Sequence, residues 1–388
     1  MRKIALLMLL LCGLSSWGQT SAEPGESVVR DVTPGPWGRV RFVPLQISPP
    51  TAAVRGFLDD AQEIRWFVMV RTREEVVAFL QGAGLDRDVI EALMSRGNPT
   101  VDRRGWLLMP TPEMVLGLPP DVRKKLYTAL SQWQENPRHR SPFRLVDHAS
   151  RDWREMAGLD DAVQARFERL VYMRGTLKVF TDLPLMLIAM KGDATVQTRF
   201  LRSVCSESTY LATLRVLPGD DVDALTRYWG VGEREEEVRP LIEAAGRAKG
   251  EIGVPLPLLL PGFPRQVLYT YAPTDDMRFL DCHYSSINFF NREADPRLVQ
   301  GLYRDTFFNA FYQEVPEAGQ LGDILVMLSP SGEVVHSCVF LAGDLVFTKN
   351  GGQRTLPWML MTLGDMKEYF STEGELTLRA YRRRLLAE

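Results

Sequence analysis

The chain has 388 residues, of which 45% are hydrophobic. This length exceeds what one hydrophobic core usually carries, so we expect two or more globular domains. The formal net charge is −3 at pH 7, with 46 basic against 49 acidic residues, and this lack of a basic excess argues against nucleic-acid binding.

The N-terminus has the pattern of a secretory signal peptide. A short basic start, Met1-Arg2-Lys3, precedes the apolar run Ile4–Cys12, which is followed by small and polar residues. This run is too short for a membrane span, which needs about 20 apolar residues. We therefore predict a signal peptide over residues 1–22, cut after Ala22 or after Gly18. The mature protein is expected to be exported to the periplasm or the extracellular space, without an integral membrane segment.

A leader and a small α/β domain follow in the sequence. Residues 23–54 are rich in Pro and Gly, which predicts an extended leader. In the expected domain over 55–140, Ile64–Val70 is typical of a strand, and the run Thr72-Arg73-Glu74-Glu75 predicts a capping box at the start of a helix.

The next region, residues 150–262, is expected to be a mostly helical domain. The apolar run Leu177–Met190 contains Pro184 and predicts a buried core helix, whereas Thr209–Leu217 alternates as a strand does. A further strand is predicted at Gln266–Tyr271, at the start of a last domain over 265–388. The fold class is therefore α+β, with a mostly helical N-terminal region that contains small sheets.

Cys282 is the candidate nucleophile of the last domain. Asp281 is a good N-cap residue, so Cys282 is expected in the first turn of a short helix, where unpaired backbone N–H groups favour a thiolate. The neighbouring His283 points elsewhere, because adjacent side chains on a helix diverge by about 100°. The base is therefore sought further along the chain.

His336 is the candidate base. It stands near the start of the predicted strand Val334–Leu341, which a hairpin joins to the strand Leu345–Thr348. A three-residue hairpin loop pairs His336 with Asn350, which would orient the imidazole. A loop one residue shorter or longer gives that role to Lys349 or Gly351.

These residues resemble a known family. Asp281-Cys282, Gly322-Asp323 and His336 match the order found in the NlpC-type branch of papain-like cysteine peptidases and amidases, over roughly residues 265–370. His283-Tyr284 replaces the usual Ser-Gly, and Ser337-Cys338 replaces Val-Gly. The resemblance implies a papain-like domain, in which the helix that bears the cysteine packs on an antiparallel sheet. It also implies cleavage of amide bonds, including those of cell-wall peptides.

Two functions of different classes follow from these patterns. The first is a secreted cysteine hydrolase with Cys282 as nucleophile, His336 as base and Asn350 as orienting residue, acting on a peptide or cell-wall substrate. The alternative is a non-catalytic cell-envelope binding or structural protein that retains a papain-like fold. We predict no cofactor and no metal, since zinc and nucleotide motifs are missing from the sequence. Cys205 and Cys338 are interpreted as structural, either as buried thiols or as a bridge.

Overall fold

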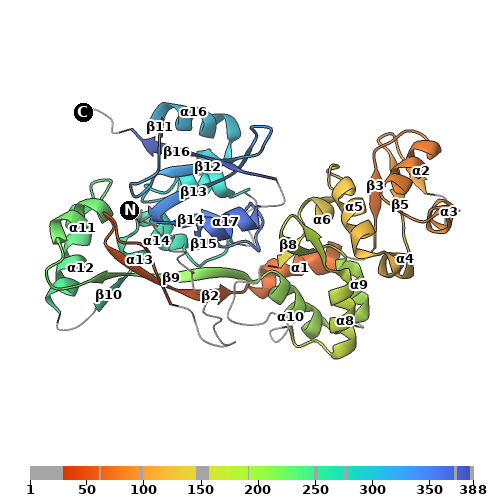
Figure 1. Cartoon of the computed structure of the whole chain (residues 1–388), viewed down its shortest axis with the longest axis horizontal. Helices are drawn as coiled ribbons and strands as arrows, with labels where there is room; N and C mark the ends of the chain where they lie inside the picture. The colour runs from red at the N-terminus through yellow and green to blue at the C-terminus, as the bar shows by residue number, and fades with distance from the viewer. Residues whose placement is uncertain are drawn as a thin grey trace, which may run out of the picture.

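The protein is described from a computed structural model covering residues 29–60, 63–95, 99–145, 157–190, 192–248, 252–273, 278–370 and 374–384. The predicted signal peptide over residues 1–22 lies outside these ranges. No helix in them combines the length and the apolar character needed to cross a membrane. The chain is α+β and builds two lobes, which are joined along one side by a long two-stranded ribbon of β2 (Arg39–Ile47) and β9 (Glu207–Val216) (Figure 1).

The insert lobe comprises residues 51–205, between the two ribbon strands. Its buried side chains form one continuous core, with Trp66, Tyr127 and Phe180 among the fully buried rings. Two small antiparallel sheets, β3-β5-β4 and β6-β8-β7, pack among its helices. The elements are α1 (Thr51–Asp60), β3 (Trp66–Val68), α2 (Arg73–Gly82), α3 (Arg87–Ser95), β4 (Thr100–Val101), β5 (Trp106–Leu108), α4 (Pro112–Gly117), α5 (Pro120–Leu130), α6 (Pro137–Arg140), β6 (Phe143–Leu145), α8 (Asp161–Leu170), β7 (Tyr172–Arg174), β8 (Leu177–Phe180), α9 (Leu183–Ala189) and α10 (Ala194–Val204).

Two local predictions in the insert lobe have different outcomes. The capping box is confirmed, because the Thr72 hydroxyl accepts from the backbone N–H of Glu75 and the Glu75 carboxylate accepts from that of Thr72. The single helix over Leu177–Met190 is wrong. Strand β8 occupies the first part of this run, and α9 starts only at Leu183, with Pro184 in its first turn, where a missing N–H costs nothing.

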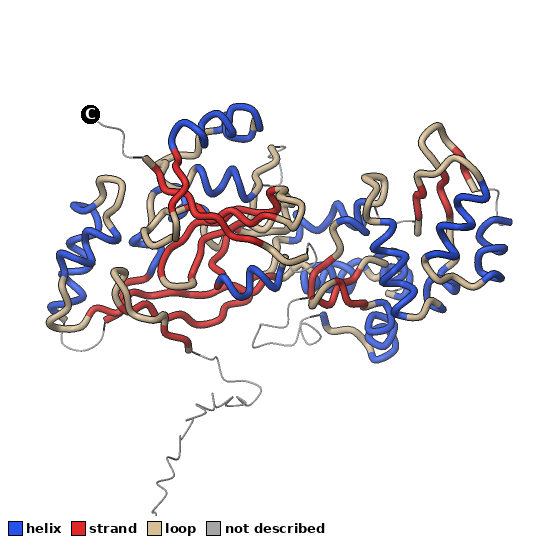
Figure 2. The backbone as a smooth tube through the Cα atoms, turned by 45° about the horizontal axis from the view of Figure 1, so that its top comes forward, coloured by secondary structure: helices blue, strands red, loops and turns tan. Residues whose placement is uncertain are grey.

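The sheet lobe comprises residues 29–48 and 206–384. A four-stranded antiparallel sheet, β1-β2-β9-β10, lies beside a six-stranded antiparallel sheet of order β11-β16-β12-β13-β14-β15 (Figure 2). Its elements are β1 (Arg30–Asp31), β2 (Arg39–Ile47), β9 (Glu207–Val216), α11 (Val222–Trp229), α12 (Glu235–Arg247), β10 (Ile252–Pro255), α13 (Leu256–Leu259), α14 (Gly262–Val267), α15 (Cys282–Ile287), the 3₁₀ helix η1 (Pro296–Val299), α16 (Gly301–Phe311), β11 (Tyr312–Val315), β12 (Ile324–Leu328), β13 (Val334–Ala342), β14 (Leu345–Lys349), β15 (Trp358–Thr362), α17 (Leu363–Tyr369) and β16 (Thr377–Arg383).

The ribbon between the lobes contains residues that were expected to belong to separate regions. Arg39–Ile47, within the predicted leader, pairs along its whole length with Glu207–Arg215. The core of the sheet lobe also takes in side chains from β9, α11 and α12, so the division between the two hydrophobic cores falls near residue 205. The predicted strand at Gln266–Tyr271 is wrong as well, because α14 ends at Val267 and only a single bridge, Leu268 to Trp358, follows.

The central strands of the six-stranded sheet, β12 to β15, are largely buried on both faces. On one face, α15 packs against β13 and β14. On the other face lies a second apolar cluster that includes Met327, Cys338 and, from the α17 segment, Tyr369 and Phe370. Alternate residues of β13 therefore enter two different buried environments.

The predicted pairing of β13 with β14 is found in the structure, although the loop that joins the two strands differs from the predicted one. Its loop has two residues rather than three, with Ala342 opposite Leu345, and a bulge at Leu341 restores the expected pairing of Phe340 with Val346. Gly343 carries a φ of 59°, which a glycine adopts without strain.

Candidate functional site

Cys282 lies where the sequence places it, at the first position of α15. The Asp281 carboxylate caps the helix by accepting from the backbone N–H of Tyr284 at 2.8 Å. The same carboxylate also pairs with the Arg304 guanidinium at 3.1 Å. The thiol is enclosed, since the residue is only 6% exposed.

The surroundings of the sulfur favour the neutral thiol. Burial raises the pKa of Cys282 to about 11, and the negative charge of Asp281 acts in the same direction. The backbone N–H groups of Ser337 and His283 partly oppose this rise in pKa, because they stabilise the thiolate. A thiol with this pKa is almost wholly protonated at neutral pH and is a poor nucleophile.

His336 is buried within the sheet lobe. It is 1% exposed, its Nε2 lies 2.8 Å from the Thr348 hydroxyl, and its ring stacks on Phe370 with 4.4 Å between centroids. Burial lowers the pKa of His336 to about 3, and the positive charges of His283 and Arg144 add to this decrease. The imidazole is therefore neutral at pH 7.

The predicted nucleophile and the predicted base lie on opposite faces of the sheet. The Ser337 hydroxyl faces α15, where it lies 2.8 Å from His283 Nδ1 and donates to the Ser286 hydroxyl at 3.2 Å. His336 precedes Ser337 on the same strand and therefore points to the other face, toward Phe370. The structure does not bring His336 to the helix that bears Cys282.

Asn350 is linked to His336 by way of the Thr348 side chain. The Thr348 hydroxyl that contacts the imidazole also donates to Asn350 Oδ1 at 3.2 Å. The Asn350 amide donates further to the Met361 sulfur at 3.1 Å. His336, Thr348 and Asn350 thus form a buried polar chain, and the sequence prediction named its two ends but not Thr348.

Lys349, which with Gly351 was an alternative to Asn350, lies on the sheet face that α15 covers. Its ammonium donates to the backbone carbonyls of Gly351 at 2.6 Å and Gln353 at 3.0 Å, and it sits over the Trp358 ring. Burial lowers the pKa of Lys349 to about 8, while the negative charges of a Cys282 thiolate and Asp281 oppose the decrease. Through these two hydrogen bonds Lys349 stabilises the loop that follows β14.

A pocket of about 640 Å³ opens on the α15 face of the sheet. His283, Ser286 and Ser337 form a hydrogen-bonded polar group at one side, and burial lowers the pKa of His283. Arg304 and Arg379 contribute cations, whereas Val326, Phe308 and Tyr381 supply apolar walls. The sequence prediction missed Ser337 and Arg379. The only signal for Ser337 was its position between His336 and Cys338.

The three cysteines in the described ranges are all free thiols. The bridge considered between Cys205 and Cys338 is therefore not formed. Burial raises the pKa of both these thiols well above the usual range. Within the same ranges, no group of three or more His, Cys, Asp or Glu side chains is arranged to hold a metal ion.

The buried neutral His336 predicts a specific dependence of stability on pH. Its folded-state pKa of about 3 lies below the unfolded value near 6.5, so its contribution is complete above pH 6.5 and is lost as the pH falls toward 3. Between pH 7 and pH 5, the wild type should lose about 2 kcal/mol more free energy of unfolding than His336→Gln. Urea denaturation at both pH values measures this difference, and equal losses in the two proteins would contradict it.

Comparisons of this chain with family models, with curated proteins and with solved structures gave no match.

Proposed function

We propose that this protein is an exported, non-catalytic binding protein of the cell envelope whose C-terminal part has a papain-like arrangement. The arrangement is supported by a helix that begins at a cysteine and packs on β13 and β14 of an antiparallel sheet. The absence of catalysis is supported above all by His336, which faces away from α15 and is held by Thr348 and Phe370. Rotation of its side chain cannot move it through the sheet.

The pocket beside α15 is the proposed binding site, and a cell-wall peptide is the proposed ligand. A peptide needs apolar contacts for its side chains, and it needs hydrogen-bonding groups for its amides and its carboxylate. The pocket offers both, with Phe308 and Val326 on the apolar side and Ser337 and Arg379 on the polar side. Arg379 is 52% exposed, so its guanidinium remains within reach of a ligand carboxylate.

Titration calorimetry with a synthetic cell-wall pentapeptide, combined with chromatography of the mixture, tests this proposal. We expect binding without release of new amines. Ser337→Val and Arg379→Gln should each weaken binding by about tenfold, since each removes a polar contact of about 1.4 kcal/mol. Lys124→Gln, an exposed change in the insert lobe, is the matched control and should leave binding unchanged. No heat of binding at millimolar peptide would overturn the proposal.

A cysteine hydrolase is the second candidate, and one observation favours it. The backbone N–H groups of Ser337 and His283 stabilise a Cys282 thiolate, as donors around a nucleophile do. For this candidate the proton would have to pass to His283, the imidazole on the α15 face, rather than to His336. Release of amines from the pentapeptide that Cys282→Ser abolishes would establish the hydrolase and exclude the non-catalytic role.

A further inference from the structure

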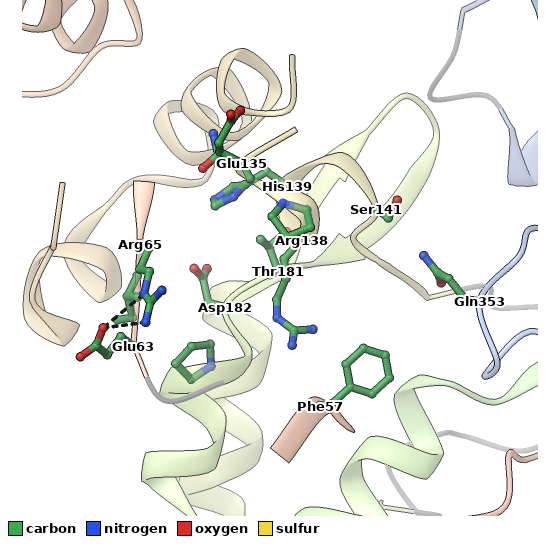
Figure 3. Close-up of a pocket in the computed structure, with 14 residues that line it drawn as sticks. Phe57, Glu63, Arg65, Glu135, Arg138, His139, Ser141, Thr181, Asp182 and Gln353 are labelled. Carbon is green, nitrogen blue, oxygen red and sulfur yellow. Dashed lines mark hydrogen bonds and ion pairs between the residues drawn. The ribbon is translucent and has the colours of Figure 1, made fainter. Parts of the chain in front are cut away.

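A second pocket, of about 540 Å³, lies in the insert lobe and faces Gln353 of the sheet lobe (Figure 3). Its volume is within the range of small-molecule sites. Asp182 and His139 both line it, and in Figure 3 their side chains project toward the same space, with Arg65 and Arg138 beside it. No residue of this pocket belongs to the site beside α15.

Two buried polar atoms that belong to residues of this pocket have no hydrogen-bond partner. Asp182 is 3% exposed and His139 is 7% exposed, yet Asp182 Oδ2 and His139 Nε2 receive no hydrogen bond. Arg123 forms an ion pair with Asp182, but its Nε lies 3.9 Å from Oδ2, a distance at which it donates no hydrogen bond. Unpartnered buried polar atoms are costly, so a ligand that satisfies them gains binding energy.

Tyr127 contacts both Asp182 and His139. Its hydroxyl donates to Asp182 Oδ1 at 2.7 Å, and its ring meets that of His139 edge-on with 4.7 Å between centroids. Burial lowers the pKa of His139 to about 3, so its ring is neutral and one of its nitrogens accepts. A carboxylate oxygen and a neutral imidazole nitrogen beside one tyrosine together match the donors of a primary ammonium group.

Positively charged side chains, Arg65 and Arg138, also line the pocket. Arg138 lines it with its guanidinium 5.0 Å from the centre of the Phe57 ring, and Arg65 lines it while paired with Glu63 at 2.9 Å. Phe57, Pro137 and Pro184 add apolar surface. We propose that this pocket binds a free amino acid or a short peptide, with its ammonium group between Asp182 and His139 and its carboxylate at Arg138.

Thermal unfolding of the full mature chain with amino acids, at about ten millimolar, tests the assignment. The probes are the standard amino acids and alanyl-alanine, each compared with its N-acetyl derivative. At least one free-amine probe should raise Tm by about 2 °C or more, and its N-acetyl form should not, because acetylation removes the ammonium charge. This comparison needs no variant. Equal shifts with the two forms, or no shift with any probe, would overturn the proposal.

Calorimetry with the best probe then tests the named residues. Asp182→Asn and His139→Phe should each weaken binding by about tenfold or more, and Arg138→Gln should weaken it for probes with a free carboxylate but not for their amides. Glu91→Gln, an exposed change on α3, is the matched control. If Asp182→Asn does not fold, the Arg138 comparison still decides the case. Unchanged affinity in Arg138→Gln and in any folded variant at Asp182 or His139 would contradict the assignment.

Discussion

Replacing Asp323 by Ala is expected to lower the free energy of unfolding by about 2–4 kcal/mol, because its buried carboxylate accepts several hydrogen bonds, although its partner Arg382 is 31% exposed. Asp323 is 1% exposed and forms a two-point pair with Arg382, at 2.8 and 2.7 Å. It also accepts from the backbone N–H groups of Gly319 and Gln320, both at 2.9 Å. The substitution leaves all of these donors without their acceptor.

Urea denaturation at pH 7, followed by tryptophan fluorescence, measures this change. Glu314→Gln is the matched control, because its carboxylate is 56% exposed and lies 3.9 Å from Arg379, so its loss should cost less than about 0.5 kcal/mol. A loss below 1 kcal/mol for Asp323→Ala would show that the pair with Arg382 does not hold β12 to β16.

Replacing Gly322 by Ala is the second large expected effect, a loss of about 2–3 kcal/mol. Gly322 has a φ of 92°, a conformation that L-residues rarely adopt, and an added Cβ would lie 2.0 Å from Cζ of Phe290. The strain of the backbone and the displacement of the Phe290 ring both oppose folding of the variant.

Gly319→Ala, three residues away, is the matched control, since a Cβ there meets no atom within 4 Å. Adding Phe290→Ala to Gly322→Ala separates the two causes, because it removes the clash and leaves the backbone strain. Equal stabilities of the Gly319 and Gly322 variants in urea denaturation would show that the turn before β12 tolerates a side chain.

The contacts of Gly322 and Asp323 indicate that this pair stabilises the fold. The glycine permits the turn that precedes β12, and the aspartate ties this turn to Arg382 on β16. The motif that resembled a hydrolase family is thus accounted for by the packing of the sheet, whether or not the chain cleaves a bond.

Local signals in the sequence were sufficient for several elements. The Asp281 cap, the Thr72 capping box and the register of the hairpin at Phe340 depend on neighbouring residues or on a short loop. The pairing of β2 with β9 has no such signal, because it joins Arg39 to Arg215 across an entire lobe.

The face to which His336 points was not predictable from the sequence. A strand with one solvated face shows an alternation of polar and apolar residues that fixes its orientation. Strand β13 is buried on both faces from His336 onward, and its two neighbouring polar residues, His336 and Ser337, are both enclosed. The composition of this strand therefore fits either orientation, and only the packing of α15 and Phe370 selects one.

Alkylation of Cys282 by iodoacetamide between pH 5 and pH 10, located by peptide mass spectrometry, tests the central claim most directly. The enclosed thiol, with burial raising its pKa to about 11, should remain unlabelled below about pH 8.5 and react slowly above it. Rapid labelling at pH 6 to 7 that disappears in His283→Ala or in His336→Ala would mean that the sulfur forms an ion pair with that imidazole. That result would contradict the account of a binding protein without a catalytic cysteine.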